Sequence, residues 1–204
     1  MKKFITLIAC FSAFAFTGNS QITFGPMAGL NMSNISGMPN SKMKMGFHIG
    51  GVAKMNFGNF YVMPGVLFSG KGTKQEVSAL NLNLKTTTSV SYLEIPINVG
   101  YSFGESGFSI IAGPYLGFGI GGKIKAEGGG ASASESIKFG SDANSDIKGM
   151  DFGVNVGAMY QLPMNLFVKA QYGIGLSDLA PVSGGTKFNN SNIQISVGYL
   201  FGGR

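Results

Sequence analysis

The segment SYLEIPINVGYSF, residues 91–103, alternates apolar side chains with polar or small ones along its length. Successive side chains of a β-strand point to opposite faces of a sheet, so this period of two indicates a strand with one apolar side. The two sides would be Leu93, Ile95, Ile97, Val99 and Tyr101 on one face, and Tyr92, Glu94, Pro96 and Asn98 on the other.

Seven other segments carry the same alternation. It is regular in residues 46–57, 150–161, 165–176 and 192–201, and less regular in residues 22–32, 60–69 and 107–120. The sequence therefore predicts eight strands. Beyond the first twenty residues, no apolar run reaches the length of about 20 residues that a membrane-spanning helix needs.

The second face of these strands is small and polar, with Gly, Asn, Ser, Gln and a few isolated charges. A secreted soluble β-sandwich, which is the alternative, would expose many Lys, Glu and Thr on that face. A barrel in lipid turns apolar side chains outward and small or polar ones inward. Inward glycines also relieve crowding in a narrow barrel. The predicted fold class is all-β, an eight-stranded antiparallel up-and-down transmembrane β-barrel.

Long and short connections alternate between the predicted strands. The long ones are residues 33–44, 70–88, 121–149 and 177–190, and the short ones are residues 58–59, 104–107 and 162–164. Outer-membrane barrels place long loops outside the cell and short turns in the periplasm. The segment 121–149 combines Gly128, Gly129 and Gly130 with many Ser and Ala residues, which predicts a flexible loop and the least ordered part of the barrel domain.

The composition narrows the class of protein. Glycine supplies 33 of the 204 residues, only 12% of residues are charged and 44% are hydrophobic. This balance excludes intrinsic disorder, which needs low hydrophobicity and high charge. The single cysteine, Cys10, excludes a disulfide framework and a Cys-based zinc site. The net charge of +6 comes without a basic stripe, so we expect no nucleic-acid partner.

The first residues are typical of a secretory signal peptide. Two lysines precede an apolar run, residues 4–16, and small and polar residues follow, with cleavage expected near Ser20 or Gln21. A lipoprotein box ending at Cys10 is the alternative, but the apolar run continues past it. The domain boundaries are then residues 1–20 for the signal peptide and 21–204 for the barrel domain.

Several motifs resemble the PorT-like outer-membrane β-barrel family, porin-like proteins of Bacteroidetes-type bacteria. They are GPMAGLNMSNISG, VMPGVLFSGKG, YLEIPINVGYSF, GPYLGFG, DFGVNVGAMY, YGIGLSDL and ISVGYLFGGR. The resemblance implies an eight-stranded barrel in the bacterial outer membrane, and one group of the family serves a secretion system. It supplies no catalytic residues. Gly202, Gly203 and Arg204 follow Phe201, whereas a terminal Phe is usual.

Polar residues on the predicted inner face form a candidate lumen network. Its members are His48, Lys54, Glu94, Asn98, Asp151, Asn155, Lys169 and Gln171. Counting from the short turns places His48, Glu94 and Asp151 in the outer half of the interior, and Lys54 and Lys169 nearer the periplasm. Such a network is either a route for a substrate or proton, or a hydrated plug that satisfies the interior.

The sequence offers little for catalysis or metal binding. A Ser-His-Asp triad would need His48, the one histidine, and a histidine-based metal cluster is impossible in one chain. The segment from Asp142 to Asp146 spaces oxygen ligands like a calcium loop, but Ile147 and Gly153 stand where that motif requires Gly and Glu. We therefore expect no catalytic residues, no cofactor and no metal.

The function predicted from the sequence is a non-catalytic role in the envelope, exerted through extracellular loops or partner proteins. A component of a secretion or envelope-assembly machine is one alternative, and a narrow solute channel is another. The expected partners are outer-membrane lipid and proteins of secretion or of the envelope, and the barrel is expected to be a monomer.

Overall fold

The computed structural model describes residues 22–79, 82–129, 131–142, 144–181 and 187–202. The predicted signal peptide, residues 1–20, lies outside the described residues. Within the described ranges, no helix is long and apolar enough to cross a membrane.

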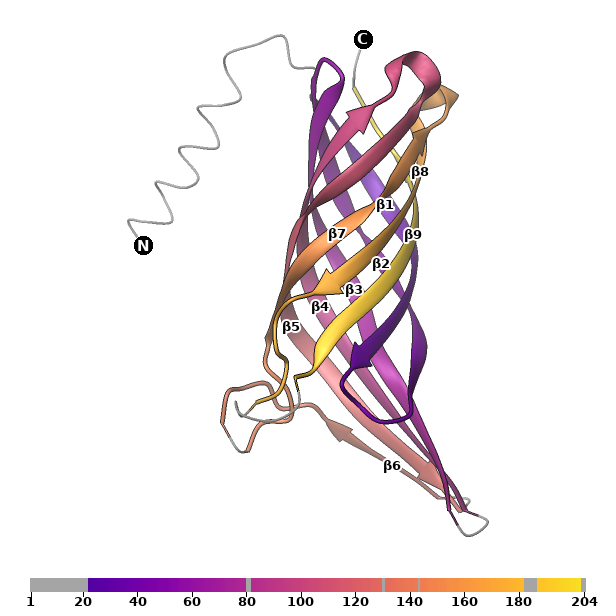
Figure 1. Cartoon of the computed structure of the whole chain (residues 1–204), viewed down its shortest axis with the longest axis vertical. Helices are drawn as coiled ribbons and strands as arrows, with labels where there is room; N and C mark the ends of the chain where they lie inside the picture. Colours follow the sequence, from indigo (N-terminus) through magenta and orange to yellow (C-terminus); the bar gives the residue numbers. More distant parts are fainter. Residues whose placement is uncertain (1–21, 80–81, 130, 143, 182–186, 203–204) are drawn as a thin grey trace.

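The described strands form one antiparallel sheet that closes on itself (Figure 1). They are β1 (Ile22–Ser36), β2 (Ser41–Phe57), β3 (Phe60–Ala79), β4 (Leu82–Ser102), β5 (Phe108–Gly128), β6 (Ala131–Ser136), β7 (Met150–Gln161), β8 (Leu166–Gly175) and β9 (Asn189–Tyr199). Each strand of the wall pairs with its neighbours in chain order, β7 follows β5, and β1 pairs with β9 to close the ring. β6 pairs with β5 beyond the end of β7. This confirms the predicted eight-stranded antiparallel barrel, made of β1–β5 and β7–β9.

Alternation along each strand separates the lumen from the lipid. In β8, every second residue from Leu166 to Ile174 is exposed, whereas Phe167, Lys169 and Gln171 are buried. Exposed apolar side chains cover the outside of the wall, among them Phe24, Leu30, Phe47, Ile49, Val99, Ile110, Val156 and Ile195. Such a surface is stable in contact with lipid chains and forms the apolar band of a membrane barrel.

The two ends of the barrel differ. The short turns lie together at one end, the top in Figure 1: Gly58–Asn59, the 3-10 turn Gly104–Ser106 and the 3-10 turn Pro163–Asn165. At the other end, β3, β4 and β5 extend far past the wall and carry β6. We call this extension, residues 70–79, 82–91, 121–128 and 131–136, the projecting sheet.

Three of the connections predicted as long loops are wrong in part, because the strands extend into them. Most of residues 33–44 and 70–88, and the first part of 121–149, are strand rather than loop. The register runs to Ala79↔Leu82 in one hairpin and to Gly128↔Ala131 in the other. The outer face of the projecting sheet lies beyond the apolar band, and its inner face is buried only near the barrel, for example at Lys71, Thr73 and Val90, so its sequence lacks the apolar alternation of a wall strand. Backbone pairing stabilises it without that pattern.

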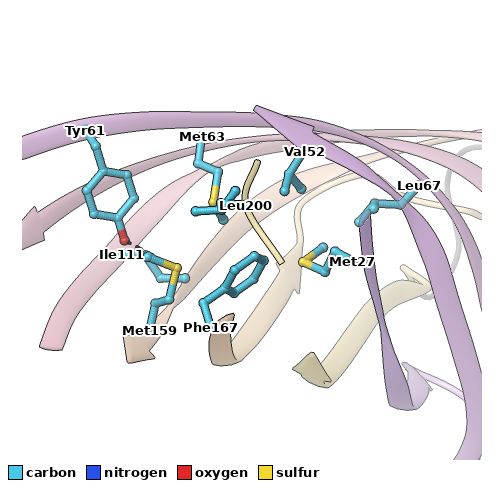
Figure 2. Packing of buried hydrophobic residues seen from close by; sticks show 9 residues of the cluster. All are labelled: Met27, Val52, Tyr61, Met63, Leu67, Ile111, Met159, Phe167 and Leu200. Atoms are coloured by element: carbon cyan, nitrogen blue, oxygen red, sulfur yellow. Dashed lines mark hydrogen bonds between the residues drawn. The ribbon is translucent and has the colours of Figure 1, made fainter. Parts of the chain in front are cut away.

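The lumen near the short turns is apolar (Figure 2). The side chains that pack there are Met27, Val52, Tyr61, Met63, Leu67, Ile111, Met159, Phe167 and Leu200. Glycine makes room for the rings, because a Cβ on Gly100 would lie 2.1 Å from the ring of Tyr61, and one on Gly198 would lie 2.3 Å from the ring of Phe167. The expectation of an inner face that is small and polar throughout is therefore wrong for this half of the barrel.

Candidate functional site

A buried ion cluster crosses the lumen between the apolar layer and the end opposite the short turns. Lys71 of β3 reaches inward, and its Nζ lies 2.6 Å from Glu94 Oε2 on β4 and 3.4 Å from Asp151 Oδ2 on β7. All three side chains are at most 2% exposed. The Lys71 ammonium also lies 4.4 Å from the centre of the Tyr115 ring, within range of a cation–π contact. One cation therefore lies between two buried carboxylates, and its charge balances only one of them.

Neutral donors complete the ion cluster. Asp151 accepts hydrogen bonds from Ser177 Oγ at 2.8 Å and from Asn190 Nδ2 at 2.8 Å. Gln194 Nε2 donates to Glu94 Oε1 at 3.3 Å. Each of these donors offsets part of the second negative charge, because hydrogen bonds to an ionised group are stronger than neutral ones.

The eight residues of the candidate lumen network all lie buried inside the barrel. Lys71 brings two of them, Glu94 and Asp151, together. Gln171 is joined to this cluster through Gln194, to which it donates. Lys54 and His48 have other partners: Lys54 donates to Gln161, and His48 contacts Asn31 and Ser196. Within the described part of the chain, Lys169 Nζ and both amide atoms of Asn98 have no hydrogen-bond partner, and neither does Asn155 Nδ2. The expected outer group of His48 with the two carboxylates is thus not joined by hydrogen bonds, and Lys54 and Lys169 do not pair with the carboxylates either.

Lys71 is the residue of this site that the sequence analysis missed, because it lies in the segment 70–88 that was predicted as a loop. The parity of β3 could have identified it. Tyr61, Met63, Leu67 and Ser69 all point inward, and Lys71 continues the same alternation two residues further on.

His48 lies in a Ser-His-Asn arrangement inside the barrel. Its Nδ1 is 2.8 Å from Asn31 Oδ1, and its Nε2 is 2.9 Å from Ser196 Oγ. An amide oxygen only accepts, so Nδ1 carries the proton and Nε2 accepts from the serine hydroxyl. This is the connectivity of a nucleophile and its base. The three side chains are at most 2% exposed, however, so the hydroxyl of Ser196 is closed to a substrate.

Two loops close the end of the lumen opposite the short turns. Ile137 and Ile147, from the loop before β7, pack with Leu179 of the loop after β8. They cover Val90 and Tyr92 of β4. We call this apolar cluster, with the partly buried Ile124, Phe139 and Phe188, the cap. It leaves a cavity of about 70 Å³ beside the β1–β2 hairpin.

Hydrogen bonds hold the second cap loop in place. The carboxylate of Asp178 accepts backbone N–H groups from Phe188 and Ala180, each at 3.0 Å. These two hydrogen bonds hold the pKa of Asp178 below its ordinary value. Ser177 anchors the start of the loop, because its hydroxyl donates to Asp151 and accepts from the backbone N–H of Phe152.

In the segment that resembles a calcium loop, the carboxylate oxygens accept hydrogen bonds from groups of the chain itself. Asp142 Oδ1 accepts from Ser145 Oγ at 2.6 Å and from the backbone N–H of Asn144 at 3.1 Å. Asp146 Oδ2 accepts from the backbone N–H of Lys138 at 2.8 Å. Over the described residues, no group of three or more His, Cys, Asp or Glu side chains is placed to hold a metal ion.

The closed antiparallel ring, its apolar outer band and its filled lumen define a transmembrane β-barrel. The chain belongs to the outer membrane protein beta-barrel domain family, whose model matches residues 14–180. It is therefore a protein of the bacterial outer membrane, as the sequence predicts.

Two solved structures have a similar chain path. Ail, the attachment invasion locus protein of Yersinia pestis, is 16% identical with a TM-score of 0.49, over 88% of this chain and 98% of that one. Neisserial surface protein A is 13% identical with a TM-score of 0.49, over 87% of this chain and 97% of that one. A comparison with curated proteins finds no match.

Proposed function

We propose that this protein is a non-catalytic platform of the outer membrane, which holds the projecting sheet outside the cell for contact with a partner protein. The observation that carries the proposal is the contrast between the two parts of the molecule. The barrel is filled along its length, whereas the projecting sheet offers a free strand edge.

The filled lumen argues against transport. A solute entering from outside meets the cap, then the Lys71 ion cluster, and then the apolar layer around Tyr61 and Phe167. An eight-stranded barrel is only wide enough for its own side chains. A narrow solute channel would need all three layers to move.

The projecting sheet offers backbone groups for binding. β6 pairs with β5 along one edge, and its six residues, Ala131–Ser136, are all exposed. Its side chains are small, and among them only Glu135 is charged. An edge strand without Lys or Pro is a template for an added strand.

The resemblance to PorT-like proteins supports a more specific version, in which the partner belongs to a secretion or envelope-assembly machine. The motif YLEIPINVGYSF carries that resemblance and lies in β4 except for its last residue, Phe103. β4 runs from the barrel wall into the projecting sheet. In the general version, the partner is any envelope or extracellular protein. Both versions treat the barrel as a monomeric anchor.

The test combines conductance with site-specific crosslinking. In a planar bilayer, the purified barrel is expected to show no discrete conductance steps, and steady steps would favour the channel. In living cells, a photoreactive residue at Ser134 of β6 is expected to form a discrete adduct, whereas the same residue at the short-turn position Glu105 is not. Adducts only at Glu105 would move the partner to the periplasm and contradict the platform.

The secretion version has its own test. A deletion strain is assayed for secreted proteins and complemented with wild type or with a Ser134→Pro variant, which removes one backbone N–H from β6. Loss of secretion that wild type restores and Ser134→Pro does not would support a machine component. Normal secretion in the deletion strain leaves only the general platform.

A further inference from the structure

The outer face of the projecting sheet is rich in lysine. Register places Lys74, Thr87 and Lys125 in one row, and Ser89 and Lys123 in the row nearer the barrel. Lys85 lies in the next row outward, between Glu76 and Glu127. On β4 these positions have the parity of Leu93 and Val99, so the lysines point in the same direction as the lipid-facing side chains.

The positive charge of this face is only partly neutralised. Lys42, which pairs with Lys74 in register, forms an ion pair with Glu76. Lys125 forms another with Glu127 at 2.7 Å. Among the described residues, no carboxylate lies within ion-pair distance of the three remaining lysines, Lys74, Lys85 and Lys123. We call these three residues the lysine face.

The lysine face begins where the apolar band ends. On β4, the outward residues are apolar from Tyr101 to Leu93 and then change to Ser91 and Ser89. A strand tilted by about 45° rises about 2.4 Å per residue along the membrane normal, so the row of Lys123 lies about 30 Å from Tyr101. The apolar band of such barrels is about 25 Å tall. Lys123 is therefore at the level of the outer-leaflet head groups, and the rows of Lys74 and Lys85 lie successively further from the membrane.

From this geometry we infer that the lysine face binds the phosphate groups of anionic lipids in the outer leaflet. Ammonium groups are phosphate ligands, and the hydroxyls of Thr87, Ser89 and Ser136 lie beside them on the same face. The opposite face of the sheet, which carries Ile124, turns toward the cap instead.

Continuity with the lipid-facing band selects a lipid as the occupant. The face continues the surface that already touches acyl chains, so a phosphate held by Lys123 can belong to a lipid whose chains lie against Phe118 and Ile120. This inference goes beyond the platform function and needs only that the barrel lies in a membrane. A partner could still dock on the edge of β6 while lipid covers the lysine face.

The experiment measures lipid preference in mixed micelles. Wild type is refolded in micelles with equal amounts of phosphatidic acid and phosphatidylcholine, and native mass spectrometry counts the lipids retained. We compare the variant Lys74→Gln/Lys85→Gln/Lys123→Gln with a control of equal charge, Lys138→Gln/Lys148→Gln/Lys187→Gln, whose lysines lie on the cap loops. Heat-dependent gel mobility verifies that each barrel is folded.

Wild type and the cap-loop control are expected to retain phosphatidic acid at least threefold over phosphatidylcholine, and the lysine-face variant to lose that preference. The preference should also fall between 50 and 500 mM NaCl and should persist in 10 mM inorganic phosphate. Equal retention of both lipids by wild type, or equal loss in both variants, would overturn the inference. Displacement of the lipid by inorganic phosphate would also overturn it, since the site would then be one for free anions.

Discussion

The hydroxyl of Ser177 lies 2.8 Å from Asp151 Oδ1, so the loop after β8 is fastened to the ion cluster inside the barrel. Asp151 is a wall residue of β7 and is bound by Lys71 from β3. The cap and the wall strands β3 and β7 thus share one buried carboxylate. Changes at Ser177 and Lys71 should therefore affect the cap and the barrel together.

Ser177→Ala should loosen the second cap loop. The change removes a hydrogen bond to an ionised group, worth about 1.5–3 kcal/mol. Hydrogen exchange of the Leu179 backbone N–H, which donates to Phe188 O at 2.8 Å, should accelerate. Ser132→Ala on the exposed β6 is the matched control and should leave that rate unchanged. Equal rates in both variants would show that Ser177 does not fasten the loop.

Lys71→Met should destabilise the barrel strongly, because it leaves two carboxylates buried without their cation. Breaking a buried ion pair by removing one partner costs about 3–5 kcal/mol. The chain has no Trp, so urea unfolding in detergent micelles is followed by circular dichroism and gel mobility. Adding Glu94→Gln and Asp151→Asn should restore much of the loss. A single Lys71→Met variant as stable as wild type would contradict the role of the ion cluster.

Ile97→Arg should cost about 2–4 kcal/mol, since Ile97 faces lipid near the middle of the apolar band. The neighbouring residue is the control. Asn98 faces the lumen, is 1% exposed and has neither amide atom hydrogen-bonded in the described structure, so Asn98→Ser should cost little. Unfolding in vesicles measures both free energies. Similar losses would mean that the two faces of β4 are assigned wrongly.

Acid should release the second cap loop. The pKa of Asp178 is lowered in the folded protein by the N–H groups of Phe188 and Ala180. The stabilisation is therefore present above the ordinary pKa of Asp, about 3.9, and is lost as the pH falls through the lower folded value. Protection of the Phe188 N–H, corrected for intrinsic exchange, should fall below pH 4. Asp178→Ala should lack this pH dependence and be unprotected throughout.

The orientation of the barrel can be measured by labelling intact cells. The barrel domain has no cysteine, so single cysteines can be placed at Ser134 on the projecting sheet and at Glu105 in a short turn. A maleimide that does not cross membranes should label the first and not the second. Labelling of Glu105→Cys alone would invert the topology.

Alternation was sufficient to predict the barrel wall. Residues such as Leu93, Ile97 and Val99 face lipid, whereas Glu94 and Asn98 face the lumen. The two environments require different side chains, so the alternation is visible in the sequence. The projecting sheet has no such difference between its faces. Water reaches much of it, so a strand such as 82–91 reads as a polar loop.

The lumen was harder to predict because its layers depend on which strands lie opposite one another. Met63, Leu67 and Phe167 are apolar residues at inward positions, and they pack together only because the ring closes around them. Lys71 meets Asp151 across the barrel, 80 positions along the chain. Periodicity gives the side of the strand that a residue occupies, but not its partner across the lumen.

The pairing of β1 with β9, for example at Met27↔Gly198, also determines the order in which the barrel can be completed. The two edges that close the ring are separated by most of the chain, so closure is a non-local step of the kind that makes β-proteins fold slowly. Until β9 arrives, β1 has an unpaired edge bordered by exposed apolar residues such as Phe24 and Leu30. An open sheet of this kind pairs readily with other chains. The assembling barrel therefore needs its free edges shielded on the way to the membrane. Shielding is no longer needed once β1 pairs with β9.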